Sequence, residues 1–137
     1  MGAVKSVTHS YSYGEYLLYH IERNDLPNVE KVLEKRPDLI NSNNFTANAK
    51  TTPLHRAAVN GNLKLAQLLL EKYHANVDGR TSNGETPLIG AVKKNKLEMV
   101  RLLLVFNANP NEVSGSGLKP VDYAILSGFY DIALALY

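Results

Sequence analysis

The sequence has no cysteine among its 137 residues. This absence excludes disulfide bonds, thiolate metal sites and cysteine nucleophiles, and it leaves the redox compartment undetermined. Long apolar runs are absent too: a stretch such as residues 102–106 (LLLVF) is far shorter than the roughly 20 residues of a membrane-spanning helix. Residues 1–10 lack the apolar segment of a secretory signal. A cytoplasmic location is therefore the default expectation.

An excess of one charge is also missing. Lys and Arg number 15 and Asp and Glu number 13, a formal net charge of +2. A nucleic-acid-binding domain normally gathers Lys and Arg into a strong basic stripe, so nucleic acid is not an expected partner. The content of apolar residues (45%) and of charged residues (20%) is ordinary, which excludes a disordered tail and a membrane protein. A chain of this length fits one compact domain.

A six-residue pattern recurs along the chain. Residues 52–57 (TPLHRA) return 34 positions later as 86–91 (TPLIGA), and 33 positions further, in degraded form, as 119–124 (KPVDYA). Behind each copy, at a fixed distance, lies a second helical pattern, in residues 61–70, 95–104 and 128–137. Two patterns in register, three times over, indicate a repeat protein.

These motifs resemble the ankyrin-repeat family, whose period is near 33 residues and whose repeats carry a Thr-Pro-Leu-His element. The resemblance implies an all-α fold, an ankyrin-repeat solenoid of stacked helix-turn-helix units with β-hairpin-like loops. It covers residues 11–137, after a flexible N-terminal tail at 1–10. The expected repeats lie at about 11–46, 47–80, 81–113 and 114–137, the last of them truncated.

The first repeat is the most divergent of the four. It is aligned through residues 25–33 (DLPNVEKVL), 36 positions before 61–69, and its extra residues fall in the polar segment 41–50, where a loop lengthens at little entropic cost. This register predicts a loop glycine at Gly14, a Thr-Pro-Leu equivalent at residues 16–18 and a helix C-cap at Asp25.

Starts and stops of helices are marked in the better-preserved repeats. Thr52 and Thr86 are predicted N-caps, each followed by a proline at the first helical position, where no N–H is needed. Gly61 and Gly128 are predicted left-handed C-caps, with Asn95 as a substitute. The second helices carry apolar residues at i, i+3 and i+4, which are Leu65, Leu68 and Leu69, and then Met99, Leu102 and Leu103. Helices this short depend on their neighbours for stability.

The two ends of the chain differ. The second helix of the first repeat is covered by charged residues, as an end repeat should be. Residues 132–137 (IALALY) end inside a helical pattern with no polar cap, so we expect the chain to be the N-terminal part of a longer protein. Gly2 followed by Ser6 matches the N-myristoylation pattern, and membrane association is expected only if Gly2 is acylated. The alternative is that Gly2 is not acylated and is present because glycine is a common second residue or because it was introduced for recombinant expression.

No group of residues predicts catalysis. The ankyrin family uses the motif histidine, here His55, to hydrogen-bond backbone between neighbouring loops, so the resemblance assigns it a structural role. The other histidines have no second ligand at metal spacing, and neither a metal nor a cofactor is expected. Residues 114–117 (SGSG) lack the Gly-Lys-Ser/Thr of a phosphate-binding loop and fit a hairpin tip. We therefore do not expect this chain to be an enzyme.

The resemblance implies a concave partner-binding face, built from loop tips and first helices. By motif register its residues are Tyr13, Arg23, Asn24, Asn48, Thr51, Val59, Asn60, Ser82, Asn83, Glu85, Lys93, Lys94, Ser116, Leu118 and Leu126. Tyrosine is favoured at interface hot spots, although Tyr13 has covering the end of the stack as a competing role. The basic run 93–96 is either a solvated face or a contact for an acidic partner. Leu118 and Leu126 either anchor a ligand or pack on a continuation of the chain.

The sequence thus predicts a monomeric protein–protein interaction module that binds a partner or substrate protein through its concave surface. One alternative is the recognition arm of an enzyme (a ubiquitin ligase, protein acyltransferase or kinase) whose catalytic domain lies beyond residue 137. Another is a stand-alone inhibitor of a second protein. The scaffold does not identify the ligand, because one fold serves many functions.

Overall fold

The computed structural model describes residues 12–42 and 51–137. These ranges contain helices and no strand. The elements are α2 (Tyr13–Glu22), α3 (Leu26–Lys35), the short 3₁₀ helix η1 (Pro37–Asn41), α4 (Pro53–Asn60), α5 (Leu63–Glu71), α6 (Pro87–Lys93), α7 (Leu97–Val105), α8 (Pro120–Ser127) and α9 (Tyr130–Leu136). In this part of the chain, none of the helices combines the length and the apolar character that crossing a membrane requires.

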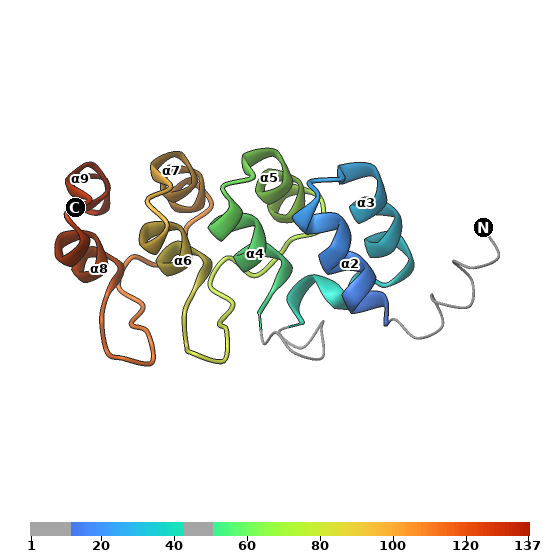
Figure 1. Cartoon of the computed structure of the whole chain (residues 1–137), viewed down its shortest axis with the longest axis horizontal. Coiled ribbons are helices and arrows are strands. Elements are labelled where there is room, and N and C mark those ends of the chain that lie inside the picture. Colours follow the sequence, from blue (N-terminus) through green and yellow to red (C-terminus); the bar gives the residue numbers. More distant parts are fainter. Residues whose placement is uncertain (1–11, 43–50) are drawn as a thin grey trace.

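The helices form a row of pairs, α2–α3, α4–α5, α6–α7 and α8–α9 (Figure 1). The first helices pack on one another in order, α2 on α4, α4 on α6 and α6 on α8, and α7 likewise packs between α5 and α9. The loops that precede α6 and α8 project to one side of the row (Figure 1). We call residues 79–86 the third finger and residues 112–119 the fourth finger.

Each finger closes on itself like a hairpin, although neither contains a strand. In the third finger the Thr81 N–H donates to the Glu85 carbonyl (3.0 Å), and in the fourth the Ser114 N–H donates to the Leu118 carbonyl (2.9 Å). A second hydrogen bond closes each tip. The Gly84 N–H donates to the Thr81 carbonyl (2.9 Å), and the Gly117 N–H donates to the Ser114 carbonyl (2.8 Å). The hairpin-like loops expected from the sequence are therefore present as turns.

The predicted helix starts are confirmed for the later repeats. Thr52 Oγ1 accepts from the His55 N–H (3.0 Å) and Thr86 Oγ1 accepts from the Ile89 N–H (3.3 Å). Lys119 has no oxygen to offer at the same place, and there the Asp122 carboxylate accepts from the Lys119 N–H (2.8 Å). Equivalent helices therefore begin at Pro53, Pro87 and Pro120 and lie side by side.

The turns between paired helices use a left-handed residue, as expected. Gly61 has φ 73°, Gly128 has φ 75° and Asn95 has φ 58°. Glycine adopts this conformation without steric cost, and asparagine tolerates it better than most residues. In the first repeat the left-handed residue is Asn24, with φ 54°, and not Asp25.

The register predicted for the first repeat is wrong by one residue. Asp25 is the N-cap of α3, where its carboxylate accepts from the Asn28 N–H (3.4 Å). The true offset to the second repeat is 37 positions (61 − 24), which pairs the fully buried Leu17 and Ile21 with the fully buried Leu54 and Ala58.

The prediction of a loop at Gly14 and of a helix start at residues 16–18 is also wrong, because α2 begins earlier than the register implies. Gly14 is a buried residue inside α2, and residues 16–18 lie in the middle of that helix. The helix begins early because Ser12 and Glu15 form a capping box, in which Ser12 Oγ accepts from the Glu15 N–H (3.1 Å) and the Glu15 carboxylate accepts from the Ser12 N–H (3.1 Å). Two extra hydrogen bonds outweigh the preference of Gly14 for a loop.

One core runs between the first and the second helices through all four pairs. Its largest members have no solvent exposure, and they include Leu17, Leu33, Leu54, Leu69, Leu88 and Leu103. Ala57, Ala58 and Ala91 are also fully buried, which lets the first helices approach closely. Burying one leucine contributes about 1.5–3 kcal/mol, so the shared core is what holds helices of seven to ten residues in place. The first helices and the third and fourth fingers are thereby fixed relative to one another.

Candidate functional site

A groove lies between the third and the fourth finger. It is lined by residues of both fingers, by one residue of α6 and by one of α8, namely Ser82, Asn83, Gly84, Glu85, Lys93, Gly115, Ser116, Leu118 and Tyr123. Six of these belong to the partner-binding set that the sequence predicts, namely Ser82, Asn83, Glu85, Lys93, Ser116 and Leu118. The fold therefore brings together residues that are up to 36 positions apart in the sequence (118 − 82).

Backbone contact between the two fingertips gives the groove its shape. The Gly115 N–H donates to the Asn83 carbonyl (3.0 Å). A Cβ on Gly115 would lie 2.6 Å from that carbonyl oxygen, and a Cβ on Gly84, whose φ is +72°, would lie 2.9 Å from the Gly115 nitrogen. Both distances are too short for a real carbon atom, so the close approach of the tips requires glycine on each side.

Arg80 ties the bases of the two fingers together. Its Nη1 donates to the Gly84 carbonyl (2.8 Å) and to the Val113 carbonyl (2.7 Å), and its Nη2 donates to the Glu112 carboxylate. One guanidinium thus links the third finger to the start of the fourth, which uses the fixed fork of donors that arginine presents. The groove is held from its base as well as from its tips.

The floor of the groove is polar. Lys93 Nζ lies 2.7 Å from Glu85 Oε2 and 5.4 Å from the centre of the Tyr123 ring. The Tyr123 hydroxyl is hydrogen-bonded to Ser114 Oγ (2.8 Å). The Glu85 side chain is only 14% exposed, so the ion pair is partly shielded from water. A cation, a carboxylate, hydroxyls and the half-buried Leu118 together offer both polar and apolar contacts to a ligand.

Two residues of the predicted partner-binding set, Thr51 and Val59, pack inside the stack or between two of its repeats. Thr51 is only 7% exposed and is hydrogen-bonded to His55 Nδ1 (3.3 Å), which corrects its placement on the concave surface. Val59 lies against Gly90 of α6, with its Cγ1 2.9 Å from where a Cβ on that glycine would be. Asn48 lies outside the described residues, as does Gly2.

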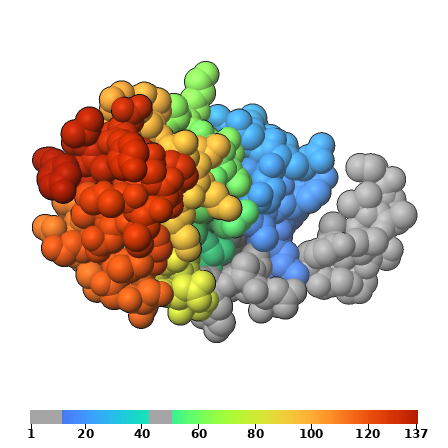
Figure 2. Space-filling view, turned by 60° about the vertical axis from the view of Figure 1, so that its left-hand side comes forward, coloured from blue at the N-terminus to red at the C-terminus, as the bar shows by residue number. Residues whose placement is uncertain are grey.

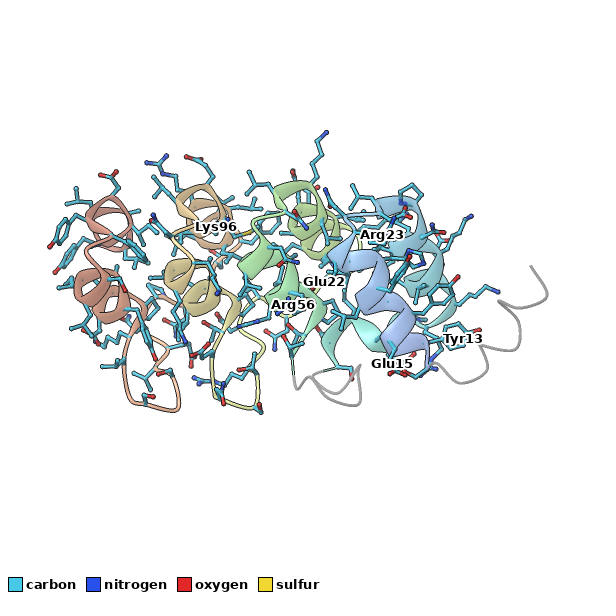
Figure 3. The ribbon with its side chains drawn as sticks, in the orientation of Figure 1. Tyr13, Glu15, Glu22, Arg23, Arg56 and Lys96 are labelled. Atoms are coloured by element: carbon cyan, nitrogen blue, oxygen red, sulfur yellow. The ribbon has the colours of Figure 1, made fainter. Side chains whose placement is uncertain are left out.

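The remaining predicted residues lie away from the groove. Tyr13, at the start of α2, has Arg36 over its ring at 5.6 Å, at the N-terminal end of the stack (Figure 3). Leu126 is 75% exposed near the end of α8. Asn24, Arg23 and Lys94 are exposed at the turns that follow α2 and α6.

Glu22 and Arg56 form a cross-repeat contact that the sequence did not predict. Arg56 Nε lies 2.9 Å from Glu22 Oε2, and Asn60 Nδ2 donates to Glu22 Oε1 (3.2 Å) (Figure 3). The predicted register placed Arg23 opposite Val59, whereas the offset of 37 places Glu22 there. The predicted register aligned Asp25 with Gly61. An alignment of the apolar residues of α2 with those of α4 would have given the correct offset and would have identified Glu22.

His55 is buried and uncharged. Burial lowers its pKa to about 4, and the carboxylate of Glu85 opposes this only in part. Within residues 12–42 and 51–137, His55 makes no hydrogen bond to the backbone of a neighbouring loop, the bond expected from the family, and its Nδ1 is hydrogen-bonded to the Thr51 hydroxyl. Its Nε2 has no hydrogen-bond partner within the described ranges and lies beside Gly90. With this low pKa, His55 is not a proton-transfer group near neutral pH.

The geometry defines a class of protein before any comparison is made. Short helix pairs that stack in a row and share one core, with finger loops that border an open groove, characterise a helical repeat protein. Over residues 12–42 and 51–137, no three His, Cys, Asp or Glu side chains come together as a potential metal site.

A family model for "Ankyrin repeats (many copies)" matches residues 43–91 and 71–124. The chain belongs to the ankyrin-repeat family. Ankyrin repeats are protein-interaction modules, and the chain is one such module.

Its relatives include proteins with very different names. A serine/threonine-protein kinase of Arabidopsis thaliana, VIK, is 32% identical over 104 residues, 76% of this chain and 23% of the relative. A probable E3 ubiquitin-protein ligase of rice, XBOS32, is 30% identical over 132 residues, 93% of this chain and 26% of the relative. A 26S proteasome non-ATPase regulatory subunit 10 of Dictyostelium discoideum is 38% identical over 85 residues, 59% of this chain and 36% of the relative. The chain thus spans roughly a quarter to a third of the length of these relatives.

Proposed function

We propose that the groove between the third and fourth fingers binds an extended segment of a partner protein. The observation that carries this proposal is the convergence of two fingers and two first helices on one open groove that holds ionic, hydroxyl and apolar groups. The fingers are joined tip to tip and base to base, so little conformational entropy is lost when they bind a partner. Leu118 is the apolar side chain in the groove and acts as the anchor.

Site-specific photo-cross-linking tests this proposal. A photoreactive amino acid is placed at the exposed Asn83 or Ser116, and the matched control carries it at the exposed Lys64 on α5. We expect Asn83 and Ser116 to cross-link the same partner protein and Lys64 not to cross-link it. Cross-linking of that partner from Lys64 alone contradicts the proposal.

Substitution of the anchor gives a quantitative second measurement. Leu118→Ala should weaken binding of the cross-linked partner by about tenfold, the effect of losing a contact worth more than 1 kcal/mol. The exposed Leu126→Ala serves as the matched control and should leave the affinity within about twofold. Circular dichroism checks that both variants keep their helices. Equal affinities for the two variants rule out the groove as the binding site.

A second proposal concerns the whole protein. The similarity to a kinase and to a probable ubiquitin ligase, of which this chain covers 23% and 26%, supports a recognition arm whose catalytic domain lies outside the chain. In such a full-length protein, Leu118→Ala should reduce modification of the captured partner but leave the activity on a generic substrate unchanged. Loss of both activities would show that the effect is on folding.

A cytoplasmic location and a monomeric state, both expected from the sequence, are further proposals for the module. Size-exclusion chromatography with light scattering tests the monomer directly. N-myristoylation of Gly2 is a separate proposal, supported by the match of residues 2–6 to the acylation pattern. Intact mass spectrometry of the protein expressed in eukaryotic cells tests it, and an unmodified N-terminus rejects it.

A further inference from the structure

Three cations lie on the turns that connect first and second helices. Arg23 is the C-cap residue of α2 and Lys94 is the C-cap residue of α6, so the two occupy equivalent positions in the first and third repeats. Lys96 is the N-cap residue of α7. Among the described residues, no carboxylate oxygen lies within 4 Å of a side-chain nitrogen of any of the three. We call Arg23, Lys94 and Lys96 the turn row.

The row extends over three successive repeats because Lys96 reaches back to the second. A Cβ on Gly61, at the turn after α4, would lie 3.1 Å from Lys96 Cδ and 3.4 Å from Lys96 Nζ. The bare glycine therefore provides the space over which the lysine side chain lies. Figure 3 shows Arg23 and Lys96 along the same edge of the stack. Positive charge is thus present above the turns of the first, second and third repeats.

The nearby carboxylates have other partners. Glu22 accepts from Arg56 and Asn60, and Glu85 pairs with Lys93. Asp25 is closest to Arg23 in the sequence, and hydrogen bonding from Asn28 is the largest cause of its lowered pKa, with Arg23 the smallest. The turn row therefore keeps an excess of positive charge that the fold does not neutralise.

Helix electrostatics act on all three cations. A cation at a helix C-terminus is stabilised by the helix dipole, which accounts for Arg23 and Lys94. Lys96 lies at a helix N-terminus, where positive charge is unfavourable. The first and second repeats have Asp25 and Asn62 at this place, both residues that favour an N-cap. The Lys96 ammonium nevertheless reaches Gly61, the C-cap of α4, where the dipole of α4 favours a cation. The turn row therefore gathers positive charge at the C-terminal ends of α2, α4 and α6.

We propose that the turn row binds an acidic segment of the partner protein. This inference rests on the proposed function, since it assigns to the same partner a second contact next to Lys93 of the groove. Three cations spaced over three repeats match a short extended segment with several Asp or Glu residues, and opposite charges set both encounter rate and specificity. Nucleic acid is disfavoured as the ligand because the chain has a net charge of only +2 and lacks a broad basic stripe.

Fluorescence anisotropy with a labelled twelve-residue Glu/Asp-rich peptide tests the inference. Lys94→Glu/Lys96→Glu should weaken peptide binding by at least about tenfold, because two attractive charges become repulsive. The matched control is Lys31→Glu/Lys35→Glu, which makes the same change of net charge at exposed positions of α3 and should alter the affinity by less than about threefold. Binding should also weaken as salt is raised from 50 to 300 mM.

Stability and competing ligands make the test decisive. Lys94→Glu replaces a cation that the dipole of α6 favours, so the neutral variant Lys94→Gln/Lys96→Gln is measured beside the double glutamate variant. The neutral variant should keep the helical circular dichroism of the original protein and should still weaken peptide binding by about threefold. Equal weakening by the control pair, or no binding of the peptide at 50 mM salt, overturns the inference. So does tighter binding of a single-stranded oligonucleotide of equal charge, which would identify a nucleic-acid site.

The groove experiment separates the two proposals. If a partner still cross-links from Asn83 while the acidic peptide fails to bind, the turn-row inference is wrong and the proposed function stands. If neither cross-linking at Asn83 nor an effect of Leu118→Ala is found, the proposed function itself is wrong.

Discussion

The third and fourth repeats share the same spacing of motifs, yet their helices differ greatly in burial. In α6, six of seven residues are buried, whereas in α8 only Pro120 and Ala124 are. At the equivalent positions Val92 and Ile125, the exposed fractions are 0% and 47%. The cause is the number of neighbouring first helices: α6 packs between α4 and α8, whereas in the described chain α8 packs on one first helix, α6, besides its own partner α9. Burial in this fold is a property of position in the row.

The difference continues onto the outer surface. Figure 2 shows the fourth repeat, in orange and red, at the end of the stack. Its exposed apolar side chains are Ile125, Leu126, Tyr130, Leu134 and Tyr137. The proposed groove lies where these two repeats meet, so it combines a firmly held third finger with a fourth finger that rests on a more weakly anchored helix pair.

The largest expected effect comes from removing core volume at matched positions in the two repeats. Leu103 in α7 is fully buried, and its equivalent 33 residues later is the partly buried Leu136 in α9. Leu103→Ala should lower the free energy of unfolding by about 4 kcal/mol, and Leu136→Ala by about 1 kcal/mol. Urea denaturation followed by circular dichroism measures both. Equal losses would show that the fourth repeat is anchored as firmly as the third.

The next effect depends on pH. Burial lowers the pKa of His55 from 6.5 to about 4, so the folded protein keeps this side chain neutral while the unfolded chain takes up a proton below pH 6.5. The stability is therefore fully present above pH 6.5 and is lost as the pH falls towards 4, by about 3 kcal/mol for a shift of this size.

The equivalents of His55 in the third and fourth repeats are Ile89 and Asp122, so this titration belongs to the second repeat. His55→Gln should flatten the stability profile between pH 6.5 and 4. The measurement is the difference between the urea midpoints of the two proteins at each pH. A wild-type profile parallel to that of the variant would show that burial does not perturb His55.

The sequence alone predicted the helix ends correctly in the second and third repeats, which form the interior of the stack. The Thr-Pro dipeptides at 52–53 and 86–87 and the left-handed Gly61 specify local backbone geometry, so they place helix ends without knowledge of the rest of the chain. Six groove residues followed from the same register because the fingers repeat at a fixed interval.

The errors lie where tertiary contacts override local signals. Gly14 was expected in a loop, but the Ser12–Glu15 capping box extends α2 past it. Thr51 was expected on the surface, but it packs against His55. The turn row was not predicted as a unit, because the reach of Lys96 across Gly61 depends on how two repeats stack. Periodicity identifies equivalent positions, whereas contacts between repeats depend on the particular side chains.

A smaller effect is expected at Gly90, whose equivalents in the second and fourth repeats are Arg56 and Tyr123. A Cβ on Gly90 would lie 2.9 Å from both His55 Nε2 and Val59 Cγ1. Alanine favours a helix by about 1 kcal/mol over glycine, but overpacking costs about 1–3 kcal/mol. Gly90→Ala should therefore destabilise the protein by about 1 kcal/mol.

The double variant Gly90→Ala/Val59→Ala isolates the steric cause. If crowding by Val59 is responsible, the cost of the alanine at position 90 should shrink in the Val59→Ala background, as a thermodynamic cycle of urea midpoints would show. A Gly90→Ala variant that is more stable than the original protein would mean that α4 and α6 are less closely packed than the distances indicate.

The smallest effect concerns the joint between the compared repeats. Arg80 binds two carbonyls and the Glu112 carboxylate, with its side chain 41% exposed, so its contribution to global stability is held to about 1 kcal/mol by competition with water. Arg80→Lys keeps the charge but loses the fork of donors, and it should leave the melting temperature nearly unchanged. Hydrogen exchange should nevertheless become faster at the Gly115 amide, which is bonded to the Asn83 carbonyl across the fingertips. Unchanged exchange at that amide would mean that the fingertips hold the groove without help from its base, and Gly115 would then be the residue on which its shape depends.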